Sequence, residues 1–286
     1  MGTRGRAFRR YPGGMSTDIW TAVRWDAPGI LDASRAEEAA KYLVTYFADL
    51  PGHTCPGYTG AMFTELGGGG DRPEVAHAVT AEDIIAVSTL SVDIDVMHAL
   101  QLTGAVASEV GDARTAIERG DARVQNARSV PIDAVEIGRL LAQLPTDLDL
   151  VDATDADLAV TDRLWAEIRR KNLGPTRASK LLARKRPRLC PVIDSFVTAQ
   201  LGHGQGRTDF FRSLRSVLQD ADLGLPAHLG VLREAAVAAA RSGSPEVLTD
   251  SGLVPGLQAA ERIGRLSDLR VLDIVLWMAE SARRRS

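Results

Sequence analysis

Apolar residues recur along much of the chain at the spacing of helix turns. In the stretch 34–50 an i, i+3, i+4 stripe consists of Ala36, Ala39, Ala40, Leu43, Val44 and Phe47. Alternating Val, Ile and Thr runs that would indicate strands are scarce, so we expect an all-α protein folded as a helical bundle. Helices are predicted at residues 34–50, 80–102, 111–127, 131–143, 154–170, 176–184, 195–201, 208–219, 229–240 and 267–282.

Two stretches interrupt the helical pattern. Residues 51–73 hold several glycines and prolines that exclude a long helix, yet Tyr58 and Phe63 still offer apolar anchors. This segment is either a connector or a loop that folds over a site, and the sequence leaves both interpretations open. Prolines and glycines break the pattern again at 242–256. We expect a disordered N-terminal extension at 1–15 and a single helical domain at 16–286.

Composition excludes several functional classes. The 34 Lys and Arg residues nearly balance 37 Asp and Glu residues, and the net charge of -3 gives no overall attraction to nucleic acid or acidic membranes. Cys55 and Cys190 are too far apart in sequence for a thiolate metal site, and Asp93 and Asp95 would point in different directions on a helix. We therefore predict no metal and no cofactor. Without a signal peptide or an 18-residue apolar run, a cytoplasmic location is expected.

One segment departs from this overall charge balance. Residues 163–188 contain ten Lys and Arg side chains and a single acid, Glu167. Such a cluster would neutralise several phosphates and bind nucleic acid in a salt-dependent way. A charge run of this kind is more usually a solvated charged face.

The centre of this segment has the pattern of a helix-hairpin-helix. A helix ends near Arg170, Asn172 and Gly174 tolerate the positive φ of a tight turn, and Pro175 suits the first turn of the next helix. The unpaired N–H groups at the start of that second helix would bind one backbone phosphate.

Twenty residues after Gly174, the sequence Cys-Pro-Val-Ile-Asp-Ser-Phe-Val places an aspartate at Asp194. Hairpin, basic helix and aspartate together resemble the helix-hairpin-helix DNA glycosylase superfamily of the endonuclease III and adenine glycosylase type. Gly174 matches the second glycine of the family's Leu-Pro-Gly-Val-Gly turn, Ala178 its alanine, and Asp194 its catalytic aspartate at the same interval. The resemblance covers about 165–201 and implies a two-lobed helical fold with a helix-hairpin-helix core at about 155–222.

Some positions depart from the family pattern. The first turn glycine is Asn172, the preceding Leu-Pro is replaced by Arg170 and Lys171, and the iron–sulfur cysteines of some members are absent. Outside the core, Tyr58-Thr59-Gly60 and Leu90-Ser91-Val92 are similar to an uncharacterised bacterial family with a degenerate version of this domain.

The resemblance implies a reaction and a set of site residues. Asp194 would activate a water or stabilise the oxocarbenium-like sugar as a flipped-out base leaves. Thr176 occupies the position at which strand-cleaving members have a lysine, so a monofunctional glycosylase is expected. Tyr58 and Phe63 would either stack on the extruded base or pin their loop to the core. The DNA partner would be contacted through Asn172, Leu173, Gly174, Thr176, Arg177, Lys180, Arg184 and Lys185.

Alternatives remain open at this point. Asp194 is also well placed to be an ordinary N-cap of the helix that begins at Ser195. The chain could equally be a non-catalytic DNA-binding module, or an enzyme acting on a small nucleoside-like substrate in the same pocket.

Overall fold

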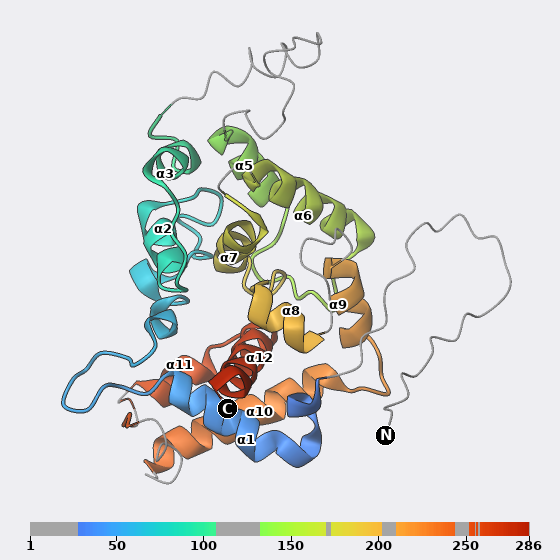
Figure 1. Ribbon diagram of the computed structural model, residues 1–286. Helices are drawn as coiled ribbons and strands as arrows, with labels where there is room; N and C mark the ends of the chain where they lie inside the picture. The colour runs from blue at the N-terminus through green and yellow to red at the C-terminus, as the bar shows by residue number, and fades with distance from the viewer. Residues whose placement is uncertain are drawn as a thin grey trace, which may run out of the picture.

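The computed structural model describes residues 28–106, 132–169, 173–201, 210–243, 252–254, 256 and 258–285. Throughout these residues the regular elements are helices and no strand occurs, which confirms the expected all-α class (Figure 1). The α-helices are α1 (Ala36–Tyr46), α2 (Ala81–Ser88), α3 (Val96–Leu102), α5 (Ala134–Leu141), α6 (Asp155–Ile168), α7 (Pro175–Lys185), α8 (Ser195–Leu201), α9 (Phe210–Leu218), α10 (Leu225–Ser242), α11 (Ala259–Gly264) and α12 (Asp268–Arg285). Short 3₁₀ turns are η1 (Gly29–Leu31), η2 (Ala33–Arg35), η3 (Thr59–Met62) and η4 (Leu66–Gly68).

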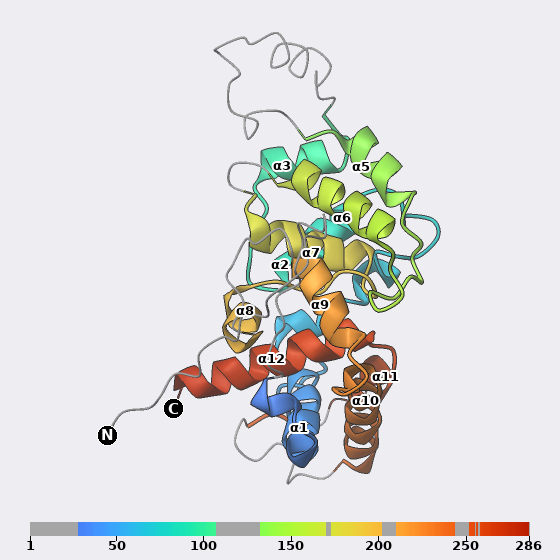
Figure 2. The same ribbon diagram turned by 90° about the vertical axis from the view of Figure 1, so that its right-hand side faces the viewer.

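Helix α12 runs across the middle of the molecule (Figure 2). Helices α1, α10 and α11 lie on one side of it, and α3, α5, α6 and α7 lie on the other. Contacts join α1 to α10 and α12, α8 to α12, and α7 to both α2 and α6. An early helix of the chain therefore packs against two of its last helices. No helix of the described segments is long and apolar enough to cross a membrane.

Most expected helices are present with slightly shifted ends, because local caps fix their boundaries. Thr80 and Asp83 form the capping box at the start of α2, and Thr154 and Asp157 form a second one at α6. The expected helix 111–127, the N-terminal extension 1–15 and Asn172 lie outside the described residues. The division into one domain at 16–286 stays a prediction.

The expectation of one helix over 80–102 is wrong. The chain leaves α2 at Ser88, turns through Ser91 with a left-handed φ of 60°, and starts α3 at Val96. Asp95 caps α3 by accepting a hydrogen bond from the His98 N–H at 3.1 Å. The apolar spacing continues through this break, so periodicity alone did not reveal it. At the interruption the carbonyls of Thr89 and Leu90 accept hydrogen bonds from the side chains of Thr59 and Lys180.

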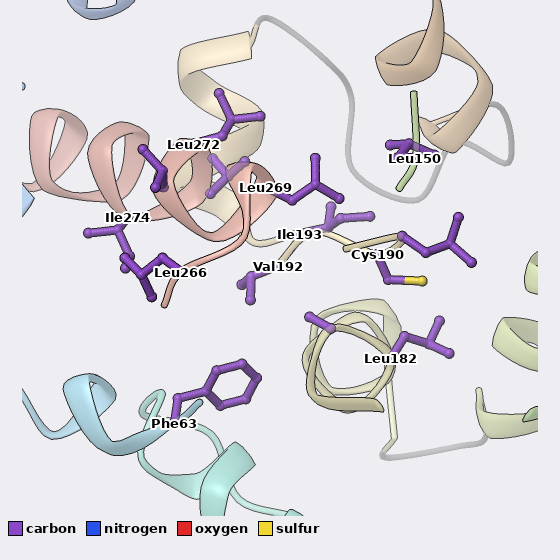
Figure 3. Close-up of a cluster of buried hydrophobic side chains, with 14 of the residues drawn as sticks. Phe63, Leu150, Leu182, Cys190, Val192, Ile193, Leu266, Leu269, Leu272 and Ile274 are labelled. Carbon is purple, nitrogen blue, oxygen red and sulfur yellow. The ribbon is translucent and has the colours of Figure 1, made fainter. Parts of the chain in front are cut away.

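An extended segment between α7 and α8 crosses the core. Figure 3 shows Cys190, Val192 and Ile193 of this segment, with α12 residues such as Leu269 on one side and Leu182 of α7 on the other. Ser179 holds the segment from α7, since its Oγ donates to the Ile193 carbonyl at 2.9 Å and accepts from the Ile193 N–H at 3.1 Å. The next residue in the chain is Asp194, so this packing fixes where its carboxylate lies.

Candidate functional site

A cavity opens where this extended segment meets α7, α12 and the loops before and after α2. It holds about 550 Å³ including its open mouth. Its wall contains Asp194 and Lys180, together with Arg270 and Asp273 of α12. Tyr58–Gly60 and Leu90–Ser91 line it from the loops, so the two short segments singled out in the sequence border one cavity.

Asp194 is nine-tenths buried and its two carboxylate oxygens have different surroundings. Oδ1 accepts hydrogen bonds from the backbone N–H groups of Phe196 and Val197, each at 3.0 Å. Oδ2 lies 3.9 Å from Nζ of Lys180. The geometry therefore includes the N-cap that the sequence indicated, while the carboxylate also lines the cavity.

Lys180 projects from α7 and is 4% exposed. Its Nζ donates to the Leu90 carbonyl at 2.8 Å, one of the carbonyls in the break between α2 and α3. Burial lowers the pKa of this amine, and the charge of Asp194 partly offsets that effect.

Arg270 and Asp273 form a buried ion pair one turn apart on α12. Arg270 Nη2 also donates to the hydroxyl oxygen of Tyr46 at 3.0 Å, and Asp273 Oδ2 accepts from the Val192 N–H at 3.2 Å. Burial raises the pKa of Asp273 to about 7, against the opposing effect of Arg270. This pair links α12 to α1 and to the segment that ends at Asp194.

Aromatic rings form much of the remaining wall. Tyr46 and Tyr58 stack with centroids 5.6 Å apart, and Trp277 meets Tyr58 edge-on at 6.0 Å. Phe196 stacks on Trp277, with ring centroids 5.5 Å apart. Such rings offer faces on which a planar ligand can stack.

The basic helix does not present most of its charge to solvent. Arg184 is 2% exposed; its Nε pairs with Asp83 at 3.0 Å, and its Nη1 donates to the carbonyls of Phe63 and Thr64, each at 2.6 Å. Lys185 is also buried and pairs with Asp83 at 3.0 Å. Arg184 and Lys185 are thus enclosed and paired inside the protein, Lys180 is buried in the cavity wall, and a contact of these three side chains with DNA stays a prediction. Charged groups are buried here because they are paired and hydrogen-bonded.

The other expected residues divide into two groups. Leu173 is buried, whereas Gly174, Thr176 and Arg177 are partly exposed at the start of α7. Arg177 donates to the Asp93 carbonyl through its Nε. Phe63 is 2% exposed and packs beneath the Arg270 guanidinium at 5.0 Å, so it pins its loop to the core and does not reach the cavity.

Tyr46, Arg270, Asp273 and Trp277 belong to the site although the sequence did not single them out as functional. A signal existed for the α12 pair, because Arg270 and Asp273 fall inside the otherwise apolar run 269–278. Across the segments described, no group of three His, Cys, Asp or Glu residues is arranged to hold a metal ion.

Fold and site together define an all-α protein with a polar, aromatic-walled cavity between α7, α12 and the loops around α2. The chain belongs to the family of unknown function DUF6308, whose model matches residues 39–135 and 128–245. These matches include Tyr46, Tyr58, Lys180 and Asp194, and end before α12. Searches of the curated proteins and of the solved structures found no match.

Proposed function

We propose that the chain hydrolyses an N-glycosidic bond and that Asp194 is its catalytic carboxylate. The observation that carries the proposal is the position of Asp194, nine-tenths buried in the wall of a cavity that also contains stacked aromatic rings. A planar base can pack against the partly exposed rings of Tyr58 and Trp277, and a carboxylate beside it can stabilise positive charge on the departing sugar.

In this reaction the bond between the sugar C1′ and the base nitrogen breaks, and its electron pair leaves with the base. Water adds to C1′ and loses one proton, and the released base gains one. Asp194 either accepts the proton of that water or stabilises the oxocarbenium-like sugar, while its bonds to Phe196 and Val197 hold the carboxylate in place. Thr176 carries no amine for a covalent intermediate, so we expect no accompanying strand cleavage.

DNA is the first candidate substrate. The support is the start of α7, where Pro175 occupies the first turn, Gly174 is the N-cap and a side chain at Gly174 would meet no atom within 4 Å. Backbone N–H groups at such a helix start can bind a phosphate. The helix-hairpin-helix assignment and the two-lobed architecture remain part of this proposal.

A small nucleoside is the second candidate, favoured by the burial of the basic side chains. With Lys180, Arg184 and Lys185 engaged inside the protein, much of the cationic surface that a DNA duplex would require is missing from α7. A free nucleoside needs only the cavity.

The test is base release by the full chain. Duplex and single-stranded oligonucleotides carrying uracil, alkylated or oxidised bases, and a parallel set of free nucleosides, would be incubated with wild type and Asp194→Asn. Asn is also a good N-cap, so this variant removes the charge while keeping the helix start. Asp133→Asn is the matched control, because Asp133 caps α5 through the N–H groups of Val135 and Glu136 and does not line the cavity.

We expect release by wild type and Asp133→Asn, and a loss of about 10²-fold or more in Asp194→Asn. Release only from nucleosides selects the second candidate. Equal base release by Asp194→Asn and wild type, or no base release by wild type from any substrate, overturns the glycosidase proposal. If wild type binds duplex DNA but releases no base, the chain is a non-catalytic DNA-binding module.

A further inference from the structure

The cavity is bordered by hydrogen-bond donors that have hydrogens to spare. Arg270 is 5% exposed and its Nη1 and Nη2 groups are occupied by Asp273 and Tyr46. Its Nε–H has no partner in the parts of the chain that the structure describes. Buried N–H groups are nearly always paired, so this one indicates either a water or a ligand atom that accepts a hydrogen bond.

Tyr46 adds a second donor at the same wall. Its hydroxyl oxygen accepts from Arg270, which leaves its own hydrogen available. The hydroxyl lies against Gly60, where an added Cβ would fall 2.0 Å from Tyr46 Oη. The wall therefore requires glycine at this position, and any larger residue would displace the hydroxyl.

Lys180 is the third donor. An ammonium has three hydrogens, and the Leu90 carbonyl accepts one of them. Oδ2 of Asp194, at 3.9 Å, is beyond hydrogen-bond distance. Among the acceptors, Asp194 Oδ1 receives two N–H groups and Asp273 receives Val192 and Arg270, whereas Asp194 Oδ2 is left for the water of the proposed reaction.

The charges point in the same direction. Lys180 and Arg270 supply two positive charges to the cavity, and Asp194 and Asp273 supply at most two negative ones. Burial raises the pKa of Asp273 to about 7, so near neutral pH part of its population carries no charge. Tyr46, the other titratable group at this wall, has a pKa raised by burial and stays protonated. The balance favours a ligand group with partial negative charge.

We propose that the cavity selects heterocycles bearing an exocyclic carbonyl oxygen, such as hypoxanthine and uracil, over the amino-bearing counterparts adenine and cytosine. A carbonyl oxygen would accept hydrogen bonds from Arg270, Tyr46 or Lys180, whereas an amino group in its place would leave donors facing a donor. This inference rests on the proposed function only in taking the ligand to be a nucleobase.

The experiment compares free bases, which have no glycosidic bond to break. Dissociation constants of hypoxanthine, adenine, uracil and cytosine for the full chain would be measured by ligand-detected NMR or calorimetry. Within each pair the ring skeleton is the same, an exocyclic oxygen replaces the amino group, and the adjacent ring nitrogen carries a hydrogen in the oxo base but accepts a hydrogen bond in the amino base. We expect each oxo base to bind at least about tenfold more tightly than its amino partner, a difference typical of one well-placed hydrogen bond.

Tyr46→Phe keeps the stacking ring and removes the hydroxyl, so the oxo-to-amino ratio should fall by about threefold or more. Tyr42→Phe is the matched control, because the Tyr42 hydroxyl bonds Glu38 and does not line the cavity. Thermal melting would check that both variants fold. The oxo-to-amino affinity ratio of the wild type tests the selectivity without any variant.

Equal affinities, a preference for the amino bases, or no binding of any base overturns the selection proposal. If Tyr46→Phe folds and keeps the full oxo-to-amino ratio, the proposed contribution of the Tyr46 hydroxyl is overturned. Failure of the glycosidase proposal is a separate result: a wild type that binds oxo bases tightly but releases no base retains the selectivity and loses the reaction.

Discussion

At the scale of single residues, Asp194 caps helix α8 and also lines the cavity. Its two carboxylate oxygens allow both. Oδ1 satisfies the N–H groups of Phe196 and Val197, while the carboxylate also faces the cavity. The capping part can be measured without any substrate. We predict that Asp194→Ala lowers the free energy of unfolding by about 0.5 to 2 kcal/mol, whereas Asp194→Asn, which still caps, loses distinctly less. Urea unfolding measures both, and equal losses would show that the cap is not the stabilising element.

Asp273 should make stability depend on pH. Burial raises its folded pKa from 3.8 to about 7, so between these values the folded state holds a proton that the unfolded state has released. Stability therefore falls as pH rises from about 4 to 7 and levels off above, by an amount on the order of a few kcal/mol.

Asp273→Asn isolates this contribution, since Asn keeps an oxygen for the Val192 N–H and does not titrate. Unfolding free energies at pH 5 and pH 8 should differ less in the variant than in wild type. Glu280 does not interfere, because its pKa is lowered by Arg283 and Arg284 and its effect lies below this window. The same pH difference in both proteins would contradict the assignment.

At the scale of elements, two glycines should respond oppositely to alanine. Gly70 lies against α7, and an added Cβ would fall 2.6 Å from the Arg184 carbonyl and 2.7 Å from Asp83 Oδ1. Neither atom can move easily within the buried ion-pair cluster, so Gly70→Ala should destabilise by about 1 to 3 kcal/mol. Gly230, inside α10, has nothing within 4 Å, and Gly230→Ala should stabilise by about 0.5 to 1 kcal/mol. Thermal melts of the two variants, shifting in opposite directions, are the check.

Helix starts were predictable because their causes are local. Thr80 and Thr154 carry their cap partners three residues on, and Pro175 stands at the first turn of α7. The break between α2 and α3 was missed, because its left-handed residue is Ser91, not a glycine or proline that marks such a turn. That break supplies the Leu90 carbonyl to Lys180, so a local irregularity shapes the site.

At the scale of the whole molecule, the meaning of the basic segment depends on what packs around it. The sequence shows the density of positive charge but not that Asp83, about a hundred residues earlier, lies between Arg184 and Lys185. The same limit applies to the site. Asp194 and Tyr58 could be chosen from local sequence, whereas Arg270 and Asp273 join them only through the packing of α12 against the segment before Asp194.

This burial predicts how any DNA binding should respond to salt. If all ten basic residues of 163–188 contacted phosphates, log K would fall with log[salt] at a slope of about -9. Lys180, Arg184, Lys185 and Arg186 are buried and Arg188 is paired with Asp149, so at most five of the ten remain for phosphates, and the slope should be no steeper than about -4.5.

Fluorescence anisotropy of a labelled duplex at several salt concentrations gives this slope. Arg177→Gln should reduce it by about 1, because one phosphate contact is lost at the exposed helix start. Arg188→Gln is the matched control, since Arg188 lies beyond the opposite end of α7 and pairs with Asp149. A slope near -9 would require the buried cations to reach solvent and would contradict the packing around Asp83, whereas a slope of about -4.5 or shallower agrees with their enclosure.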